Sequence, residues 1–233
     1  MRVVLLTTET AHHAYLAWKL AEHNHLAGVI LEEPAPPGPY DTHHPFEDRR
    51  DEYESDVLLA GMDGSPSDLA PTVKVSSVND AVHDVKGLKP DLVVDFGTRR
   101  ITQELIGAAP VCLNLHGGNP EQYRGLDSHL WVVYRHDWDQ LVTTLHHMDG
   151  ELDTGPIAGQ EPVPVSRKMP LYKLRAQNTW VCTELVMEAL RTLETPGFLP
   201  RREQARKGRY YGAMPAVLKE VCVRVFDAHT GNV

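Results

Sequence analysis

The stretch from Val111 to His116 carries two polar side chains, Asn114 and His116, near the end of an otherwise apolar run. Because side chains alternate between the faces of a strand, Cys112, Asn114 and His116 are predicted to share one face. Ligands of open α/β sheets bind outside the carboxyl ends of the strands. The Asn-x-His pair is therefore placed for chemistry, although a capped strand end is the alternative that this motif alone leaves open.

A second polar cluster runs from Thr144 to Pro156, where a predicted strand leads into an acidic turn. Alternation places Thr144 and His146 on one face of that strand. An acidic turn by itself is commonly just solvated. An amide donor, an imidazole and a carboxylate that converge at one sheet edge, however, supply the parts needed for acyl transfer.

The elements that must position these residues alternate between short apolar runs and helical stretches. This pattern predicts an α/β fold with a Rossmann-like, mostly parallel sheet and helices on both faces. Strands are predicted at 3–6, 26–31, 73–75, 92–96, 111–116, 141–148 and 157–165, and helices around 14–21, at 128–134 and at 171–193. The proline-rich, charged stretch 32–55 is predicted to be an exposed loop.

Residues 1–195 are predicted to form one domain, followed by a C-terminal extension over 196–233 that resembles an appendage more than a domain. The extension carries a group of basic and aromatic residues, namely Arg201, Arg202, Arg206, Arg209, Tyr210 and Tyr211. Such residues can supply charge for a diphosphate and a stacking surface. A solvated face explains the same residues equally well.

The formal net charge of −9 disfavours nucleic acid and anionic membrane as partners, because both require a basic surface. The three cysteines are odd in number and widely spaced, so neither a disulfide framework nor a cysteine metal cage is indicated. The apolar N-terminal stretch is too short for a signal peptide, and no run approaches the roughly 20 apolar residues of a membrane span. We therefore expect a soluble, cytoplasmic protein.

Two common α/β sites and a metal site are disfavoured. The turn after the first strand, residues 7–11, has no glycine, whereas dinucleotide binding needs glycines there, and no Walker-type phosphate loop is present. The 13 histidines include the adjacent pairs at 12–13, 43–44 and 146–147. Adjacent side chains point apart on a helix or strand, so these pairs are poor chelates and we expect no metal.

Three ordered motifs resemble the folate-dependent formyltransferases, which include glycinamide ribonucleotide, methionyl-tRNA and sugar-nucleotide N-formyltransferases. They are Asn114-x-His116, the loop Pro120-x-x-Tyr123-Arg124-Gly125 and Leu152-Asp153-Thr154-Gly155-Pro156. The resemblance covers roughly residues 1–193, and 95–98 also resembles the loop after the fourth strand of sugar-type members. This sequence departs from the family pattern at 116–120, which is not a His-Pro-Ser type loop, and at Val142, where a glycine is expected.

The resemblance implies an enzyme that moves a formyl group from 10-formyltetrahydrofolate to an amine, with Asn114, His116 and Asp153 as its catalytic set. It implies donor contacts, largely through backbone groups, from Phe96, Gly97, Thr98, Asp149, Gly150 and Leu152. Substrate contacts are expected from Tyr123, Arg124, Gly125 and His146. A preorganised N–H donor at the oxyanion of such a reaction is worth a few kcal/mol, about 3–4 in well-studied cases.

The acceptor is predicted to be a small-molecule amine. A methionyl-tRNA enzyme should carry a second folded domain and a basic channel, and a glycinamide ribonucleotide enzyme should carry phosphate-binding glycines. This sequence indicates none of these features, so both acceptors are disfavoured. Among short relatives with a tail, a nucleotide-linked amino sugar is the commonest substrate. The alternatives are another small amine, of antibiotic or amino-acid origin, a formyltetrahydrofolate hydrolase, and a non-catalytic binding module, which would be expected to lose part of the catalytic set. The sequence leaves a homodimer open.

Overall fold

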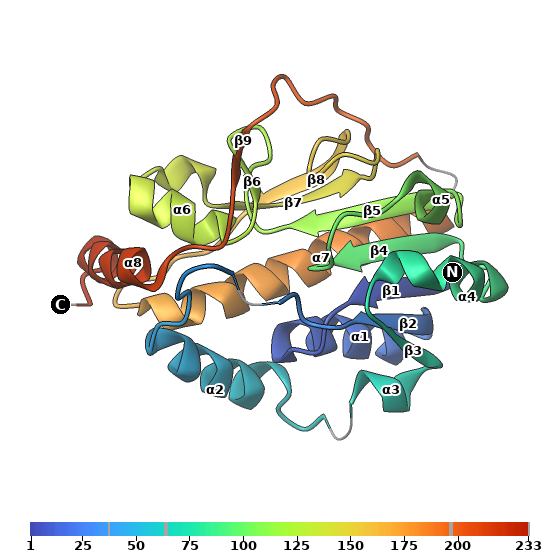
Figure 1. The fold of residues 1–233 in the computed structure, drawn as a ribbon, viewed down its shortest axis with the longest axis horizontal. Helices are drawn as coiled ribbons and strands as arrows, with labels where there is room; N and C mark the ends of the chain where they lie inside the picture. The colour runs from blue at the N-terminus through green and yellow to red at the C-terminus, as the bar shows by residue number, and fades with distance from the viewer. Residues whose placement is uncertain (37, 63–64, 196–197, 233) are drawn as a thin grey trace.

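A seven-stranded sheet forms the centre of the computed structural model, which describes residues 1–36, 38–62, 65–195 and 198–232 (Figure 1). Its strand order is β3-β2-β1-β4-β5-β7-β8. The strands are β1 (Val3–Thr7), β2 (Leu26–Glu32), β3 (Thr72–Val75), β4 (Leu92–Phe96), β5 (Val111–His116), β7 (Val142–His147) and β8 (Ile157–Pro162). The first five are parallel to one another. β7 is antiparallel to β5, and β8 is antiparallel to β7, so β7 alone runs opposite to the rest, which confirms the predicted α/β, mostly parallel sheet.

Helices cover both faces of this sheet. They are α1 (Ala11–Glu22), α2 (Phe46–Leu58), α3 (Pro66–Leu69), α4 (Val82–Gly87), α5 (Gln103–Ile106), α6 (Ser128–Arg135), α7 (Leu174–Glu194) and α8 (Ala216–Thr230). The alternate residues Val3 and Leu5 of β1 pack with α1 and α7, whereas Val4 and Leu6 pack with α4 and α5. The continuous apolar runs in the sequence thus arise because both faces of the parallel strands are buried.

Sheet register brings the polar residues of three neighbouring strands abreast. Asp95 of β4 is the register partner of Asn114 of β5, and Asn114 is in turn the partner of His146 on β7. His116 pairs with Thr144 on the same two strands. The two motifs identified in the sequence therefore meet, because β7 runs antiparallel to β5 and returns its polar end to the same region.

The predicted exposed loop 32–55 is wrong over its second half, where α2 begins at Phe46. The spacing of apolar residues does not indicate this helix, because two of the residues that it buries are acids, Glu47 and Glu54. Each is paired with a cation, Glu47 with Lys219 at 2.9 Å and Glu54 with Arg175. Ion pairing thus replaces an apolar stripe on this helix. Residue 37 of the predicted loop lies outside the described residues.

The C-terminal extension packs onto the sheet domain by a helix and a short strand. Met214, Cys222 and Phe226, from α8 and the segment before it, are buried in one apolar cluster with residues of α6. Strand β9 (Arg209–Tyr211) pairs in parallel with β6 (Tyr123–Gly125) in a second, two-stranded sheet. The predicted division between residues 195 and 196 adjoins residues 196–197, which are not described, and stays a prediction. No helix of the described chain is long and apolar enough to cross a bilayer.

Candidate active site

Asn114 joins the two predicted motifs through its side-chain amide. Its Nδ2 lies 2.9 Å from His146 Nε2 and 3.2 Å from Asp153 Oδ1. The Nδ1 of His146 is 2.9 Å from the carbonyl oxygen of His147. Nδ1 therefore carries the imidazole proton, and the Nε2 lone pair accepts from Asn114. Both N–H groups of the amide are thus directed at other members of the site.

Asp153 is buried in the turn after β7, in left-handed backbone with φ 54°. Its Oδ2 accepts a hydrogen bond from the Gly125 amide at 2.8 Å, and His116 Nδ1 and His146 Nε2 each lie 3.6 Å from Oδ1. Burial alone would raise the pKa of this carboxyl, but the neighbouring His116 and the Gly125 N–H hold the pKa well below its usual range. Asp153 is therefore a carboxylate at neutral pH.

His116 is buried, with its two ring nitrogens in different surroundings. Its Nε2 donates to the Tyr123 carbonyl at 2.6 Å, which leaves Nδ1 facing Asp153. The ring lies close to Gly118, where a Cβ atom would stand 3.3 Å from Nε2 and 2.7 Å from the Ser128 Cβ. The glycine-rich loop after β5 thus leaves space for an imidazole in a fixed orientation.

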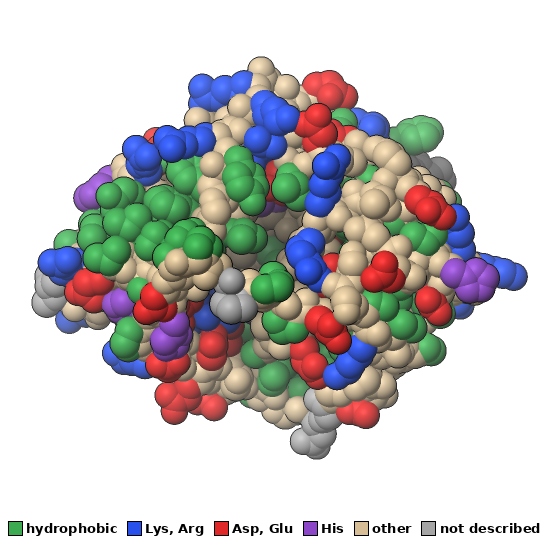
Figure 2. All heavy atoms as spheres, in the orientation of Figure 1, with side chains coloured by type: hydrophobic (Ala, Val, Ile, Leu, Met, Phe, Trp, Pro, Cys, Tyr) green, Lys and Arg blue, Asp and Glu red, His purple; other side chains and the backbone are tan. Residues whose placement is uncertain are grey.

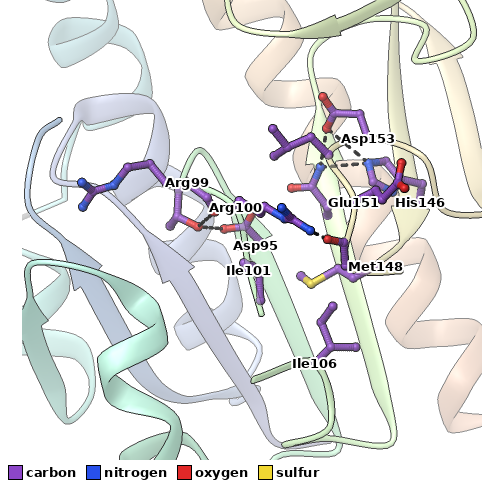
Figure 3. Close-up of a pocket in the computed structure, with 13 residues that line it drawn as sticks. Asp95, Arg99, Arg100, Ile101, Ile106, His146, Met148, Glu151 and Asp153 are labelled. Atoms are coloured by element: carbon purple, nitrogen blue, oxygen red, sulfur yellow. Dashed lines mark hydrogen bonds and ion pairs between the residues drawn. The ribbon is translucent and has the colours of Figure 1, made fainter. Parts of the chain in front are cut away.

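A pocket opens beside these residues, between the loop after β4 and the turn after β7 (Figure 3). It is lined by Asp95, Thr98, Arg99, Arg100, Ile101, Ile106, Asn114, His146, Met148, Gly150, Glu151, Leu152 and Asp153. Of the predicted donor residues, Thr98, Gly150 and Leu152 line it. Phe96 and Gly97 do not line it and lie against His13, with 4.5 Å between the Phe96 and His13 ring centroids. The Asp149 side chain accepts from Thr154 at 2.9 Å within the turn.

Two side chains tie the walls of this pocket together. Arg100 Nε donates to the Gly150 carbonyl at 3.0 Å, and Gln103 Nε2 donates to the Asp149 carbonyl at 2.7 Å. The volume of the pocket is about 60 Å³, which is room for a few water molecules. A bicyclic ring would therefore have to separate these walls. The apolar side chains of Ile101, Ile106 and Met148 offer it a suitable surface.

Asp95 is a residue of the pocket that the sequence analysis did not place among the site residues. Only 5% of it is exposed, and Thr98 Oγ1 donates to its Oδ1 at 2.6 Å. Burial raises the pKa of this carboxyl to about 7, with further contributions from nearby Glu32 and Asp153. The available signal was an acid inside the continuous apolar run 92–96, which is an unusual position for a charge.

An open basic cleft of about 430 Å³ adjoins the pocket. Its lining consists of Arg100, Arg124, Glu151, Leu152, Lys207 and Tyr210. Arg124 Nη1 donates to the Leu152 carbonyl at 2.8 Å, Lys207 forms an ion pair with Glu151, and Tyr210 is half exposed. Figure 2 shows basic side chains beside a hollow on this face of the molecule. The predicted substrate residue Arg124 and part of the C-terminal extension thus meet here.

Other residues singled out in the sequence have structural partners. Tyr123 is buried, its hydroxyl donates to Asp137 Oδ2 at 2.8 Å, and its ring stacks on Tyr211 with 5.4 Å between centroids. Arg202 pairs with Glu121 at 2.9 Å. Among the described residues, no group of three or more His, Cys, Asp or Glu is arranged to hold a metal ion.

Comparison with known proteins identifies the family. Residues 1–188 match the family described as formyl transferase, so the chain belongs to the formyl transferase family. A methionyl-tRNA formyltransferase of Trichlorobacter lovleyi is 27% identical over 154 residues, which are 65% of this chain and 48% of that protein. A second, from Thermotoga maritima, is 26% identical over 167 residues, 70% of this chain and 52% of that protein. The chain spans about half the length of these relatives.

Solved structures share the fold. A sugar N-formyltransferase from a Shewanella species has a TM-score of 0.62 at 16% identity, over 97% of this chain and 88% of that one. HypX from Aquifex aeolicus, solved with tetrahydrofolic acid, has a TM-score of 0.59 at 21% identity, over 94% of this chain and 31% of that one. At these identities the likeness describes the architecture.

Proposed function

We propose that this protein is a folate-dependent N-formyltransferase that moves a formyl group from 10-formyltetrahydrofolate to the primary amine of a small molecule. The observation that carries the proposal is the convergence of Asn114, His116 and Asp153 beside a pocket with an apolar floor. Family membership and the tetrahydrofolate bound to the structurally similar HypX support the donor.

The donor supplies a formyl carbon that is attacked by the amine, and a C–N bond to the amine forms as the bond to the folate nitrogen breaks. Asn114 stabilises the oxygen that becomes negative during this exchange. Its two N–H groups now meet His146 and Asp153, so one of them must turn toward the formyl oxygen. The N–H directed at His146 is the one released at lower cost, because the bond to the Asp153 carboxylate is charge-assisted.

Asp153 and His116 move the proton. The amine loses a proton when it attacks, and Asp153 is an ionised, buried acceptor for it. The Nε2–H of His116 remains on the Tyr123 carbonyl, so Nδ1, which faces Asp153, is the nitrogen that exchanges a proton. The proton finally leaves with the folate nitrogen, which balances the reaction.

The acceptor is proposed to be a nucleotide-linked amino sugar. The basic cleft beside the pocket combines Arg124 and Lys207, which attract a diphosphate, with the half-exposed ring of Tyr210, on which a base can stack. The likeness in fold to sugar N-formyltransferases supports the same class. Another small anionic amine would fit the same chemistry.

The proposal is tested by mass spectrometry of reactions that contain 10-formyltetrahydrofolate and a panel of nucleotide-linked amino sugars, aminoglycosides and free amino acids. A product heavier by one formyl group is expected with a nucleotide-linked amino sugar. A product with another amine alone would overturn the substrate class. Donor consumption without a formylated product would indicate hydrolysis, and no consumption with any amine would contradict the proposed reaction.

A further inference from the structure

An extended segment of the C-terminal extension lies across the turn that carries Asp153, and we call this segment, residues 202–211, the strap. Its first residue exchanges two backbone hydrogen bonds with Ile157, at 2.8 and 3.0 Å. The Gly208 amide donates to the Pro120 carbonyl at 3.1 Å, and β9 then pairs with β6. Figure 1 shows this segment arching above β8 and then running down beside β6. The strap therefore contacts the loop before β6 and the chain on the far side of the Asp153 turn.

Gln204, near the start of the strap, holds the main chain of the turn. Its Nε2 donates to the carbonyl of Asp153 at 3.0 Å and to that of Gly155 at 2.9 Å. Its Oε1 is buried and has no hydrogen-bond partner among the described residues. A buried acceptor without a partner is unfavourable, so the side chain is placed here for what its N–H groups do. One amide thus clamps both ends of the Asp153–Gly155 turn.

Strand β9 holds the side chain of Asp153 through Gly125. Gly125 is the register partner of Tyr211, and its N–H is the one that donates to Asp153 Oδ2. A Cβ atom at Gly125 would lie 2.3 Å from the Tyr211 carbonyl oxygen, so the two strands approach each other as only a glycine permits. The orientation of the carboxylate therefore depends on the pairing of β6 with β9.

Asp153 needs this support because its backbone is left-handed, with φ 54°. A residue other than glycine adopts that conformation at a cost, and it persists where the surrounding structure fixes it. The turn has the strap on one side and the pocket on the other. Formyl transfer requires the carboxylate to stay within about 0.5 Å of its productive position.

We propose that Gln204 is a positioning residue of the formyl-transfer site, which acts through Asp153 by clamping the turn to the strap. This inference rests on the proposed function. It assigns the C-terminal extension a part in building the catalytic centre, in addition to the contribution that Lys207 and Tyr210 make to the cleft. Gln204 itself lines neither the pocket nor the cleft.

The test compares Gln204→Met, which keeps the length of the side chain and removes its N–H donors, with the wild-type protein. Glu203→Gln, at the exposed neighbouring position, is the matched control. Single-turnover rates are measured with 10-formyltetrahydrofolate and the amine found in the panel, together with both Michaelis constants and the melting temperature. Hydrogen exchange of the amides in 150–156 is measured in parallel and needs no activity.

We expect Gln204→Met to lower the transfer rate by about 10- to 100-fold, because a small misplacement of a catalytic group has an effect of that size. Both Michaelis constants should stay within about 3-fold of the wild type, and exchange in 150–156 should increase. In an Asp153→Asn background the same substitution should cause little further loss, since its partner is already disabled.

Three results would overturn the inference: an unchanged rate in Gln204→Met, unchanged amide exchange in 150–156, or the same fold-loss in both backgrounds. The last result would mean that Gln204 supports the fold generally. If the wild-type protein transfers no formyl group at all, the proposed function fails, and the exchange measurement alone then decides whether Gln204 clamps the turn.

Discussion

Asp95 and Asn114 lie directly opposite each other on β4 and β5, and both line the pocket beside Asp153. The Asn114 amide, which we propose stabilises the formyl oxygen, is therefore bordered by two carboxyl groups, Asp95 and Asp153, whose pKa values are shifted in opposite directions. The pKa of Asp153 is held low by His116 and the Gly125 N–H, whereas burial raises the pKa of Asp95 to about 7. Asp95 thus changes its charge near neutral pH, within the same pocket.

The raised pKa of Asp95 predicts a pH-dependent effect on stability. Between the ordinary pKa of an aspartate, about 3.9, and the folded value near 7, the folded protein binds more protons than the unfolded chain, so stability falls as the pH rises. Asp95→Asn removes this penalty. We expect its melting temperature, relative to the wild type, to rise by roughly 4–8 °C between pH 5 and pH 8, equivalent to about 2 kcal/mol.

Differential scanning fluorimetry across that pH range checks this expectation, with Asp56→Asn at an exposed position of α2 as the control. The control should show a flat difference from the wild type. A flat difference in Asp95→Asn as well would mean that the Asp95 carboxyl is ionised in the folded protein at pH 5.

Removal of the proposed transition-state groups should separate binding from turnover. Asn114→Ala and His116→Ala should each lower the single-turnover rate by about 10²- to 10³-fold, since loss of an oxyanion donor, at Asn114, or of a proton-transfer group, at His116, has an effect of this size. Tetrahydrofolate binding, measured by calorimetry, should change little, because the apolar wall of Ile101, Ile106 and Met148 is intact. His83→Ala, exposed on α4, is the control. A variant as active as the wild type would remove that residue from the mechanism.

The sequence was sufficient for the parts of the site that depend on strand periodicity. Alternation in 111–116 and 144–148 placed Asn114, His116 and His146 on the faces where the structure has them, and the apolar runs located all seven strands of the sheet. The helix α2 was missed because its buried acids are paired with cations from distant elements, Arg175 and Lys219. Such pairing leaves no periodic signal in the local sequence.

The strap was missed for a related reason. Gln204 reaches carbonyl groups 49 and 51 residues earlier in the chain, and hydrogen bonds to main-chain atoms require no particular residue at the other end. The basic residues of the extension were interpreted together as a charged or solvated face. In the structure the residues of this group divide, because Arg202 is tied to Glu121 whereas Tyr210 lines the cleft.

The hydrogen bond from Gln103 to the turn after β7 predicts that Gln103 competes with the donor. The Gln103 amide donates to the Asp149 carbonyl, one of the backbone groups that the family resemblance assigns to the pterin. Donor binding must break this contact, so the free energy needed to open the pocket should be smaller in a protein that lacks it. We expect Gln103→Ala to bind tetrahydrofolate about 2- to 10-fold more tightly by calorimetry, since one net hydrogen bond is worth about 1 kcal/mol. Weaker binding would show that Gln103 contacts the donor instead.

Lys207 provides the most direct test of what the basic cleft binds. Its ion pair with Glu151 is exposed, so Lys207→Ala should leave stability almost unchanged. If the cleft holds the diphosphate of the acceptor, the Michaelis constant of a nucleotide-linked amine should rise by about 3- to 10-fold, an effect of roughly 1 kcal/mol that shrinks in high salt. Lys74→Ala disrupts a similarly exposed pair with Glu9 and is the matched control. A selective loss of donor affinity would instead place the acidic end of the folate in the cleft, and the amine would then have to enter from the side of His116.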